Sequence, residues 1–123
     1  MDNKIIIAVD AMGGEGSPKK ILDGIAHFLK SKENIFFNIF GDEKKIKNCI
    51  SKNLPKSNYK IFHTEEFVKD EDTAFSGAKN KKTSMWLAVE SVKKQDSDIV
   101  ISAGNTGALF VIAKLNLEMI DNI

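Results

Sequence analysis

The sequence contains no arginine, because all 18 of its basic residues are lysines. With 17 acidic residues the formal net charge is only +1, which excludes a strong electrostatic case for nucleic-acid binding. Any anion bound by this chain must use backbone N–H groups, lysines or short polar side chains, since no guanidinium can form a bidentate contact.

Cysteine and long apolar runs are scarce as well. The single cysteine, Cys49, excludes an intrachain disulfide and a cysteine-based zinc cluster, and we interpret it as a small apolar residue on a helix face. His27 and His63 have no partner at metal-ligand spacing, so we expect no metal and no cofactor. Apolar runs such as 5–9 and 108–113 are far below the ~20 residues of a membrane span, and no signal peptide is visible, which favours a cytoplasmic protein.

Strand and helix patterns alternate along the chain. The alternation predicts an α/β fold, in which a mainly parallel sheet is covered by helices. Ser17 is expected to cap the first helix, and Thr83 or Ser84 a later one. We expect strands over 4–9, 35–40, 59–62 and 99–102, and helices from 18, over 42–52, from 84 and from 106.

Residues 64–82 interrupt this alternation. The segment is acidic in its first half and basic in its second, with weak periodicity, which predicts a long, mobile, functional loop. Its basic part contains Lys79, Lys81 and Lys82, just before a predicted helix. These lysines could attract an anionic substrate or an acidic protein, and the alternative is an ordinary solvated loop.

A glycine-rich turn over 10–18 follows the first strand. Gly13 and Gly14 allow a ligand to approach the backbone closely, and the next helix offers free N–H groups to an anion. Asp10, at the end of the strand, would point into the ligand crevice as an acceptor or an orienting carboxylate. The spacing matches neither the dinucleotide fingerprint nor the P-loop. The alternative is a tight turn with no ligand.

A second turn of this kind covers 102–108. Ser102, Asn105 and Thr106 supply short polar side chains beside Gly104 and Gly107 at a predicted helix start. Many neutral donors at close range suit a tetrahedral oxyanion such as phosphate. A helix cap without a ligand is the alternative for this turn alone, and the presence of two such turns in one sheet favours the anion site.

Segments 9–14 and 102–109, with 81–85 between them, closely resemble the signature segments of the bacterial phosphate acyltransferase (PlsX) family. The resemblance implies transfer of a fatty acyl group from acyl carrier protein to inorganic phosphate, giving the acyl phosphate used in phospholipid synthesis. It also implies a three-layer α/β/α fold like that of the phosphotransacetylases and the isocitrate/isopropylmalate dehydrogenases, and a homodimer associated peripherally with the inner face of the membrane.

This chemistry assigns roles to the two turns and the lysines. Phosphate is itself a nucleophile, so the reaction needs positioning and oxyanion stabilisation rather than a catalytic triad. The expected roles are catalysis by Asp10, Asn105 and Thr106, phosphate binding by Gly13, Gly14, Ser102, Gly104 and Gly107, and carrier-protein contact by Lys79, Lys81 and Lys82.

The chain is only about a third of a full-length member's size, so we expect residues 1–123 to be a single, incomplete N-terminal α/β portion of a longer enzyme. The last helix has no stop signal over 117–123. Two alternatives are a phosphate-binding module without catalysis and a half-enzyme that needs a separate C-terminal partner. A nucleotide-binding oxidoreductase is the least favoured. Apolar residues surround much of the last helix: Phe110, Val111, Ile112, Leu115 and Leu117.

Overall fold

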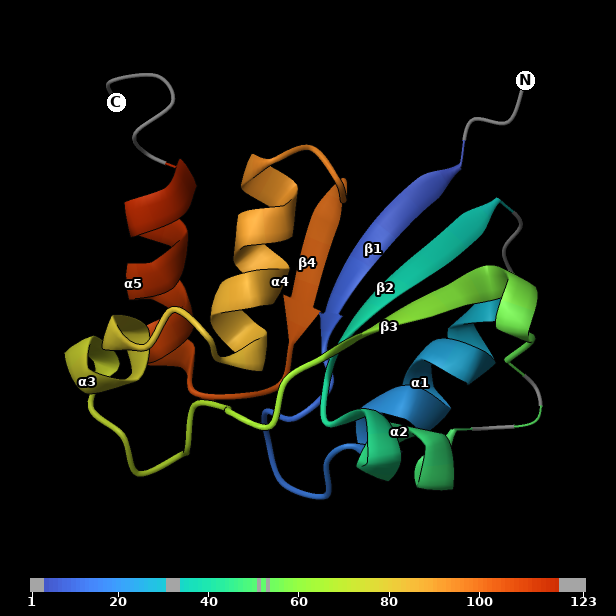
Figure 1. The fold of residues 1–123 in the computed structure, drawn as a ribbon, viewed down its shortest axis with the longest axis horizontal. Coiled ribbons are helices and arrows are strands. Elements are labelled where there is room, and N and C mark those ends of the chain that lie inside the picture. The colour runs from blue at the N-terminus through green and yellow to red at the C-terminus, as the bar shows by residue number, and fades with distance from the viewer. Residues whose placement is uncertain (1–3, 31–33, 51, 53, 118–123) are drawn as a thin grey trace.

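A computed structural model of the protein describes residues 4–30, 34–50, 52 and 54–117. Strands and helices alternate as predicted (Figure 1). The strands are β1 (Ile5–Asp10), β2 (Ile35–Gly41), β3 (Tyr59–His63) and β4 (Ile99–Ser102). The helices are α1 (Lys19–Leu29), α2 (Glu43–Cys49), the short 3₁₀ turn η1 (Lys56–Asn58), α3 (Ala74–Lys79), α4 (Ser84–Lys93) and α5 (Thr106–Leu117).

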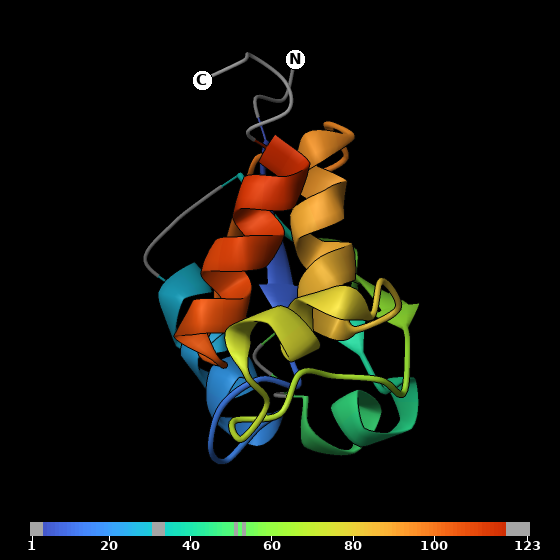
Figure 2. The same cartoon turned by 90° about the vertical axis from the view of Figure 1, so that its left-hand side faces the viewer.

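The four strands form one parallel sheet in the order β3-β2-β1-β4. In the centre of the sheet Ile7 of β1 lies opposite Phe37 of β2 and Ile99 of β4. Helices α1 and α2 cover one face, while α4 and α5 lie beyond the other, with α3 beside them (Figures 1 and 2). The predicted three-layer α/β/α class with a parallel sheet is therefore confirmed.

The α1 face carries the larger apolar core. Alternate residues of β1, Ile7 and Val9, point to this side because successive strand residues face opposite ways. They pack with Phe37 and with Leu22 of α1, and both Phe37 and Leu22 are fully buried. Cys49 lies partly buried against the same core, which confirms its interpretation as an apolar helix residue.

The α4 face has two smaller clusters. Ala8 of β1 packs with Phe40 and with Ala88 of α4, and small residues at these positions let the helix approach the sheet. A second cluster joins α3, α4 and α5 around Trp86 and the fully buried Ile112. Together these contacts fix the start of α4 close to the ends of β1 and β4.

Residues 64–82 contain more regular secondary structure than the sequence predicted. They contain helix α3, which Thr73 caps by accepting the amide of Ser76 at 3.1 Å. The amide of Ser84 donates to the Glu66 carbonyl at 3.0 Å, and Thr64 Oγ1 donates to the Lys82 carbonyl at 2.7 Å. The prediction of one long loop was wrong because a six-residue helix is too short to give a periodic signal. Its mobility stays a prediction.

The structure corrects the predicted cap of the first helix and decides between the two predicted caps of α4. Helix α1 begins at Lys19 with Pro18 in the capping position, and Ser17 does not cap it. The Ser17 hydroxyl donates instead to the Gly13 carbonyl inside the turn. Thr83 caps α4 by accepting the amide of Trp86 at 3.1 Å. Within the described ranges no helix is long and apolar enough to cross a membrane, and the missing stop signal over 118–123 lies outside the described residues.

Candidate functional site

The two glycine turns touch each other at the carboxyl edge of the sheet. Because β1 and β4 are parallel neighbours, the turns that follow them leave the sheet side by side. A Cβ atom at Gly13 would lie 2.9 Å from the Gly104 Cα and 2.7 Å from Asp10 Oδ2. Gly14 has a φ of +91°, and a Cβ there would lie 2.6 Å from the Ala103 carbonyl oxygen. Only glycine allows this close approach of two backbones.

The Asp10 carboxylate accepts hydrogen bonds from both glycine turns. Its side chain is buried, with 1% of its surface exposed. Oδ1 accepts the Ser84 hydroxyl at 2.6 Å and the Met12 amide at 3.1 Å, and Oδ2 accepts the Ser102 hydroxyl at 2.8 Å. The carboxylate is an acceptor, as predicted, but it lies under the turns rather than in an open crevice, because α4 brings Ser84 over it. Its hydrogen bonds therefore hold the two turns and the start of α4 together, and its catalytic role stays a prediction.

Ser102 and Asn105 are also engaged by the protein. The Ser102 oxygen, besides donating to Asp10, accepts the Gly104 amide at 3.1 Å. Asn105 caps α5 by accepting the Ala108 amide at 3.0 Å. Its Nδ2 donates to the carbonyls of Lys69 and Asp72 at 3.2 and 2.7 Å. Both residues shape the site, and Asn105 ties the segment 69–72 over the start of α5.

The start of α5 keeps donors for a ligand. The first amides of a helix have no partner within it, and Asn105 caps only that of Ala108. Among the hydrogen bonds of the described residues, none uses the amides of Thr106 and Gly107, and Thr106 is exposed. A Cβ at Gly107 would lie 3.1 Å from the Ala74 Cβ, so this glycine also lets α3 approach α5. Since the first turn of a helix favours anions through its dipole and unpaired amides, this end of α5 is the candidate anion site.

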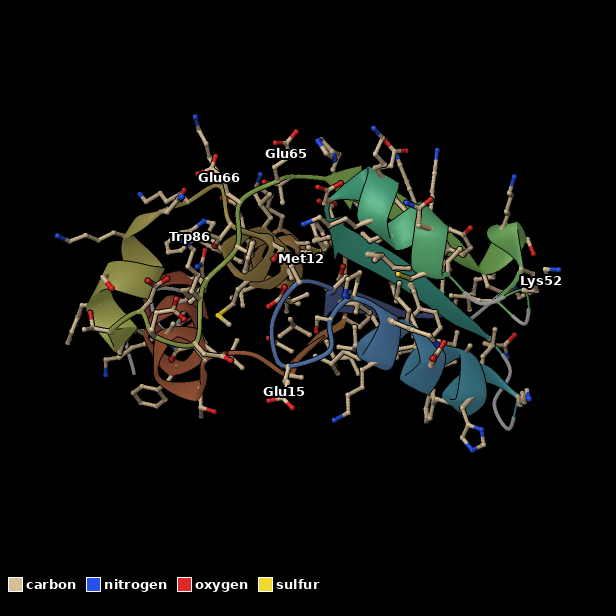
Figure 3. The ribbon with its side chains drawn as sticks, turned by 90° about the horizontal axis from the view of Figure 1, so that it is seen from below. Met12, Glu15, Lys52, Glu65, Glu66 and Trp86 are labelled. Carbon is tan, nitrogen blue, oxygen red and sulfur yellow. The ribbon has the colours of Figure 1, made fainter. Side chains whose placement is uncertain are left out.

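A hollow of about 370 Å³ opens beside the first turn. Figure 3 looks at this edge of the sheet and shows the turn that carries Met12 and Glu15, with the segment after Glu66 crossing beside it. One lysine and two carboxylates lie along its wall, so side chains alone do not make it a strongly positive site. The lining residues are Met12, Gly14, Phe67, Val68, Lys69, Asp70 and Glu71.

The predicted carrier-protein lysines lie elsewhere. Lys79 and Lys81 line a separate groove of about 220 Å³ together with Phe75 and Trp86. The Lys81 Nζ lies 5.5 Å from the centre of the Trp86 ring, within cation–π range. Lys82 is exposed beside them in sequence. The structure therefore does not bring these lysines into the hollow beside the glycine turns.

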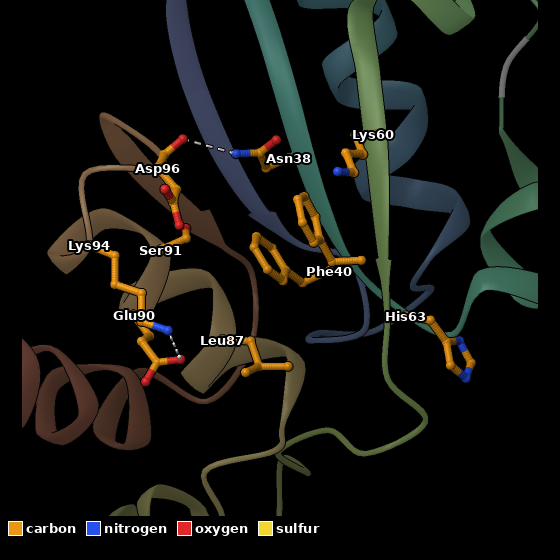
Figure 4. A pocket seen from close by; sticks show the side chains of 10 residues that line it. Asn38, Phe40, Lys60, His63, Leu87, Glu90, Ser91, Lys94 and Asp96 are labelled. Atoms are coloured by element: carbon orange, nitrogen blue, oxygen red, sulfur yellow. Dashed lines mark hydrogen bonds and ion pairs between the residues drawn. The ribbon is translucent and has the colours of Figure 1, made fainter.

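A further hollow, of about 690 Å³, lies on the α4 face beside β3 (Figure 4). It is lined by the stacked rings of Phe40 and Phe62 and by polar side chains, among them Asn38. The Asn38 amide donates to the Asp96 carbonyl at 3.2 Å and to the Ser97 hydroxyl at 2.9 Å. None of the residues predicted for the site lies there.

Sequence reasoning missed the part played by Ser84. It considered this residue only as a helix cap, whereas the side chain is fully buried and bonds to Asp10 across 74 positions of sequence. A hydroxyl residue directly after the capping Thr83 was the available signal. The anchoring of segment 69–72 by Asn105 was also missed, since no local pattern reports on a contact between loops.

Comparison with known proteins identifies the family of the chain. A family described as "Fatty acid synthesis protein" matches residues 5–123. Over 124 residues the chain is 61% identical to the phosphate acyltransferase of Pelagibacter ubique (strain HTCC1062), covering all of this chain and 37% of that relative. The phosphate acyltransferase of Neorickettsia sennetsu is 36% identical over 98% of this chain, which covers 36% of that relative.

A third relative gives a similar result. The phosphate acyltransferase of Streptococcus thermophilus (strain ATCC BAA-491 / LMD-9) is 41% identical over 89% of this chain and is covered to 34%. The chain thus spans little more than a third of the length of these relatives. Since the family match extends over almost the whole sequence, the chain belongs to the fatty acid synthesis protein family and corresponds to an N-terminal part of its phosphate acyltransferases.

Proposed function

We propose that this chain forms the phosphate-binding part of an enzyme that transfers a fatty acyl group from acyl carrier protein to inorganic phosphate. The observation that carries the proposal is the contact of two glycine turns at the start of α5, where amides and the Thr106 hydroxyl remain for an anion. The names of the relatives supply the reaction class, and the geometry fits it because a chain without arginine must bind phosphate through such groups.

The proposed reaction needs no side-chain nucleophile. A phosphate oxygen attacks the thioester carbonyl carbon, a C–O bond forms and the C–S bond breaks. The carrier's sulfur leaves as a thiolate and takes a proton from solvent. The amides of Thr106 and Gly107 hold the phosphate, and Asp10 keeps the two turns in register through Ser102 and Ser84. Positioning of the nucleophile is the main contribution of this part of the enzyme.

The partners belong to the same proposal. Lys79, Lys81 and Lys82 form an exposed basic stretch at the end of α3 and the start of α4, and it would contact the acidic carrier protein. We place the reaction in the cytoplasm, at the inner face of the membrane that receives the product, and the homodimer of the full-length enzyme is part of the same hypothesis.

A second function is favoured by the short span of the match. The chain covers 37% of the Pelagibacter relative, so it can act as a half-enzyme that binds phosphate and needs the C-terminal part for turnover. In this case the isolated chain binds phosphate without forming acyl phosphate.

A chimera tests the main proposal. The matched segment of the Pelagibacter phosphate acyltransferase is replaced by this chain, and formation of acyl phosphate from acyl carrier protein thioester and labelled phosphate is measured. We expect activity within about tenfold of the unaltered relative, because the two segments are 61% identical. A folded chimera without activity, beside an active relative, would contradict the proposal.

The role of Thr106 is tested in the same chimera. Thr106→Val removes the hydroxyl at nearly constant volume, and Thr106→Ser keeps it. Because Thr106 is exposed, both variants should unfold at the same temperature as the parent chimera. We expect the KM for phosphate to rise roughly tenfold in Thr106→Val, the value of one lost hydrogen bond to a charged group, and to stay near the parental value in Thr106→Ser. Equal KM values would show that the hydroxyl does not hold phosphate.

A further inference from the structure

An apolar groove of about 380 Å³ lies between α1 and β4, away from the glycine turns. Ile99 and Ile101 of β4 are 50% and 36% exposed, and Phe28 of α1 is 42% exposed. Their neighbours Ile7 and Phe37 are buried members of the core. The apolar side of the sheet therefore extends beyond the helix that covers it.

The reason for the exposure is visible in the sheet order. Strand β4 is an outer strand, and its pairing within the described residues is with β1 alone (Figure 1). Ile99 and Ile101 lie opposite Ile7 and Val9, so they share the face that α1 covers. Helix α1 packs over the central strands and leaves this outer part of the face open.

The handedness of the crossover connections indicates where a strand that follows α5 would lie. Helices α1 and α2 lie on one face and connect strands that step from β1 towards β3, while α4 lies on the other face and leads back to β4. Parallel crossovers are right-handed. Helix α5 packs beside α4 on that second face, so a strand after α5 would pair with the free edge of β4.

The longer relatives contain a further segment that can supply such a strand. The Pelagibacter phosphate acyltransferase matches all of this chain with only 37% of its own length, so nearly two thirds of it has no counterpart here. A segment of that size can supply a strand along β4 and an apolar helix over the groove, which together remove an unpaired edge and an exposed apolar face.

We infer that the groove between α1 and β4, with the free edge of β4, is the docking surface for the part of the family's chain that follows the matched segment. A strand of that part pairs in parallel with β4, and an apolar segment covers Phe28, Ile99 and Ile101. The occupant is the same whether it is joined to residue 123 or supplied as a separate polypeptide. The inference rests on the proposed function only through the longer relatives and does not require acyl transfer.

Co-expression tests the inference. This chain, carrying an affinity tag, is produced together with the part of the Pelagibacter relative that follows the matched segment, and copurification is measured. We expect a stable one-to-one complex, which the double variant Ile99→Asp/Ile101→Asp weakens at least about 30-fold, as expected when central interface contacts are lost. Phe75→Asp is the matched control, because Phe75 is a large apolar residue on α3 with 73% of its surface exposed. It should change the affinity less than threefold.

Hydrogen exchange gives a second readout that needs no variant. In the complex, the β4 amides that do not bond to β1 should exchange at least about tenfold more slowly, while the outer amides of β3 at the opposite edge keep their rates. Failure to copurify, protection of β3 in place of β4, or equal weakening by Phe75→Asp and the double variant would each overturn the inference. A complex that forms but makes no acyl phosphate would leave the docking surface standing and refute the proposed function. If the chimera is active but the two separate parts do not associate, the proposed function stands and the docking surface is refuted.

Discussion

Replacing Asp10 by alanine should destabilise the chain strongly, because one buried carboxylate holds three donors from three parts of the fold. The Ser84 hydroxyl and the Met12 amide are buried and cannot turn to water when their acceptor is removed. Leaving a buried donor unpaired costs about 1–3 kcal/mol, so these two groups set the expected loss at about 4 kcal/mol. Ser102 is only partly buried and adds little.

Urea and thermal unfolding measure this loss. A domain of this size has a total stability of roughly 5–15 kcal/mol, so Asp10→Ala should lower the unfolding midpoint by about 15 °C, followed by circular dichroism. The control is Asp23→Ala on α1, which breaks only an exposed pair with Lys19 and should leave the unfolding midpoint nearly unchanged. If Asp10→Ala lowers the free energy of unfolding by less than about 1 kcal/mol, the carboxylate does not hold the two turns together.

Three further predictions concern the glycines, the α5 cap and Ser84. Gly13→Ala should cost about 2–3 kcal/mol in urea unfolding, because its Cβ would meet Asp10 Oδ2 and the Gly104 Cα at less than 3.0 Å. Gly24→Ala on α1 meets no atom within 4 Å and should instead stabilise by about 0.5–1 kcal/mol. Asn105→Ala should cost about 1–2 kcal/mol and speed amide exchange over 69–72. Ser84→Ala should cost about 1 kcal/mol and show coupling to Asp10→Ala in a double-mutant cycle.

Each of these has a result that would contradict it. Equal effects of Gly13→Ala and Gly24→Ala would show that the backbones of the two turns do not need their close approach. Unchanged exchange over 69–72 in Asn105→Ala would remove the argument that this side chain ties the segment. Additive effects of the Ser84 and Asp10 variants would show that their hydrogen bond contributes nothing of its own.

Local patterns predicted the sheet well. Strand β4 was predicted with its observed bounds, because a short apolar run stands between Asp98 and the small residues of the second turn. The parallel arrangement followed from the alternation of strands and helices. Ser17 was misassigned since its hydroxyl bonds to Gly13 within the turn, which competes with helix capping.

The site was predicted only in outline. That two glycine turns meet could be inferred, because turns after parallel strands share one edge of the sheet. The hydrogen bonds that hold the turns together could not be inferred, since Ser84 and Asp10 are 74 positions apart. The packing of α4 places the Ser84 hydroxyl, and no local pattern encodes that packing. For the same reason, the separation of Lys79 and Lys81 from the glycine turns became visible only in the structure.

The phosphate site is tested by titrating the isotope-labelled chain with inorganic phosphate and following the backbone amide resonances by NMR. Because the sequence has no arginine, we expect saturable shifts centred on the amides of Thr106 and Gly107, with smaller shifts in the first glycine turn. Asp10→Ala should abolish these shifts or weaken the binding. Shifts confined to Lys79, Lys81 and Lys82, or no saturable shift at α5 at all, would show that the two turns do not form a phosphate site.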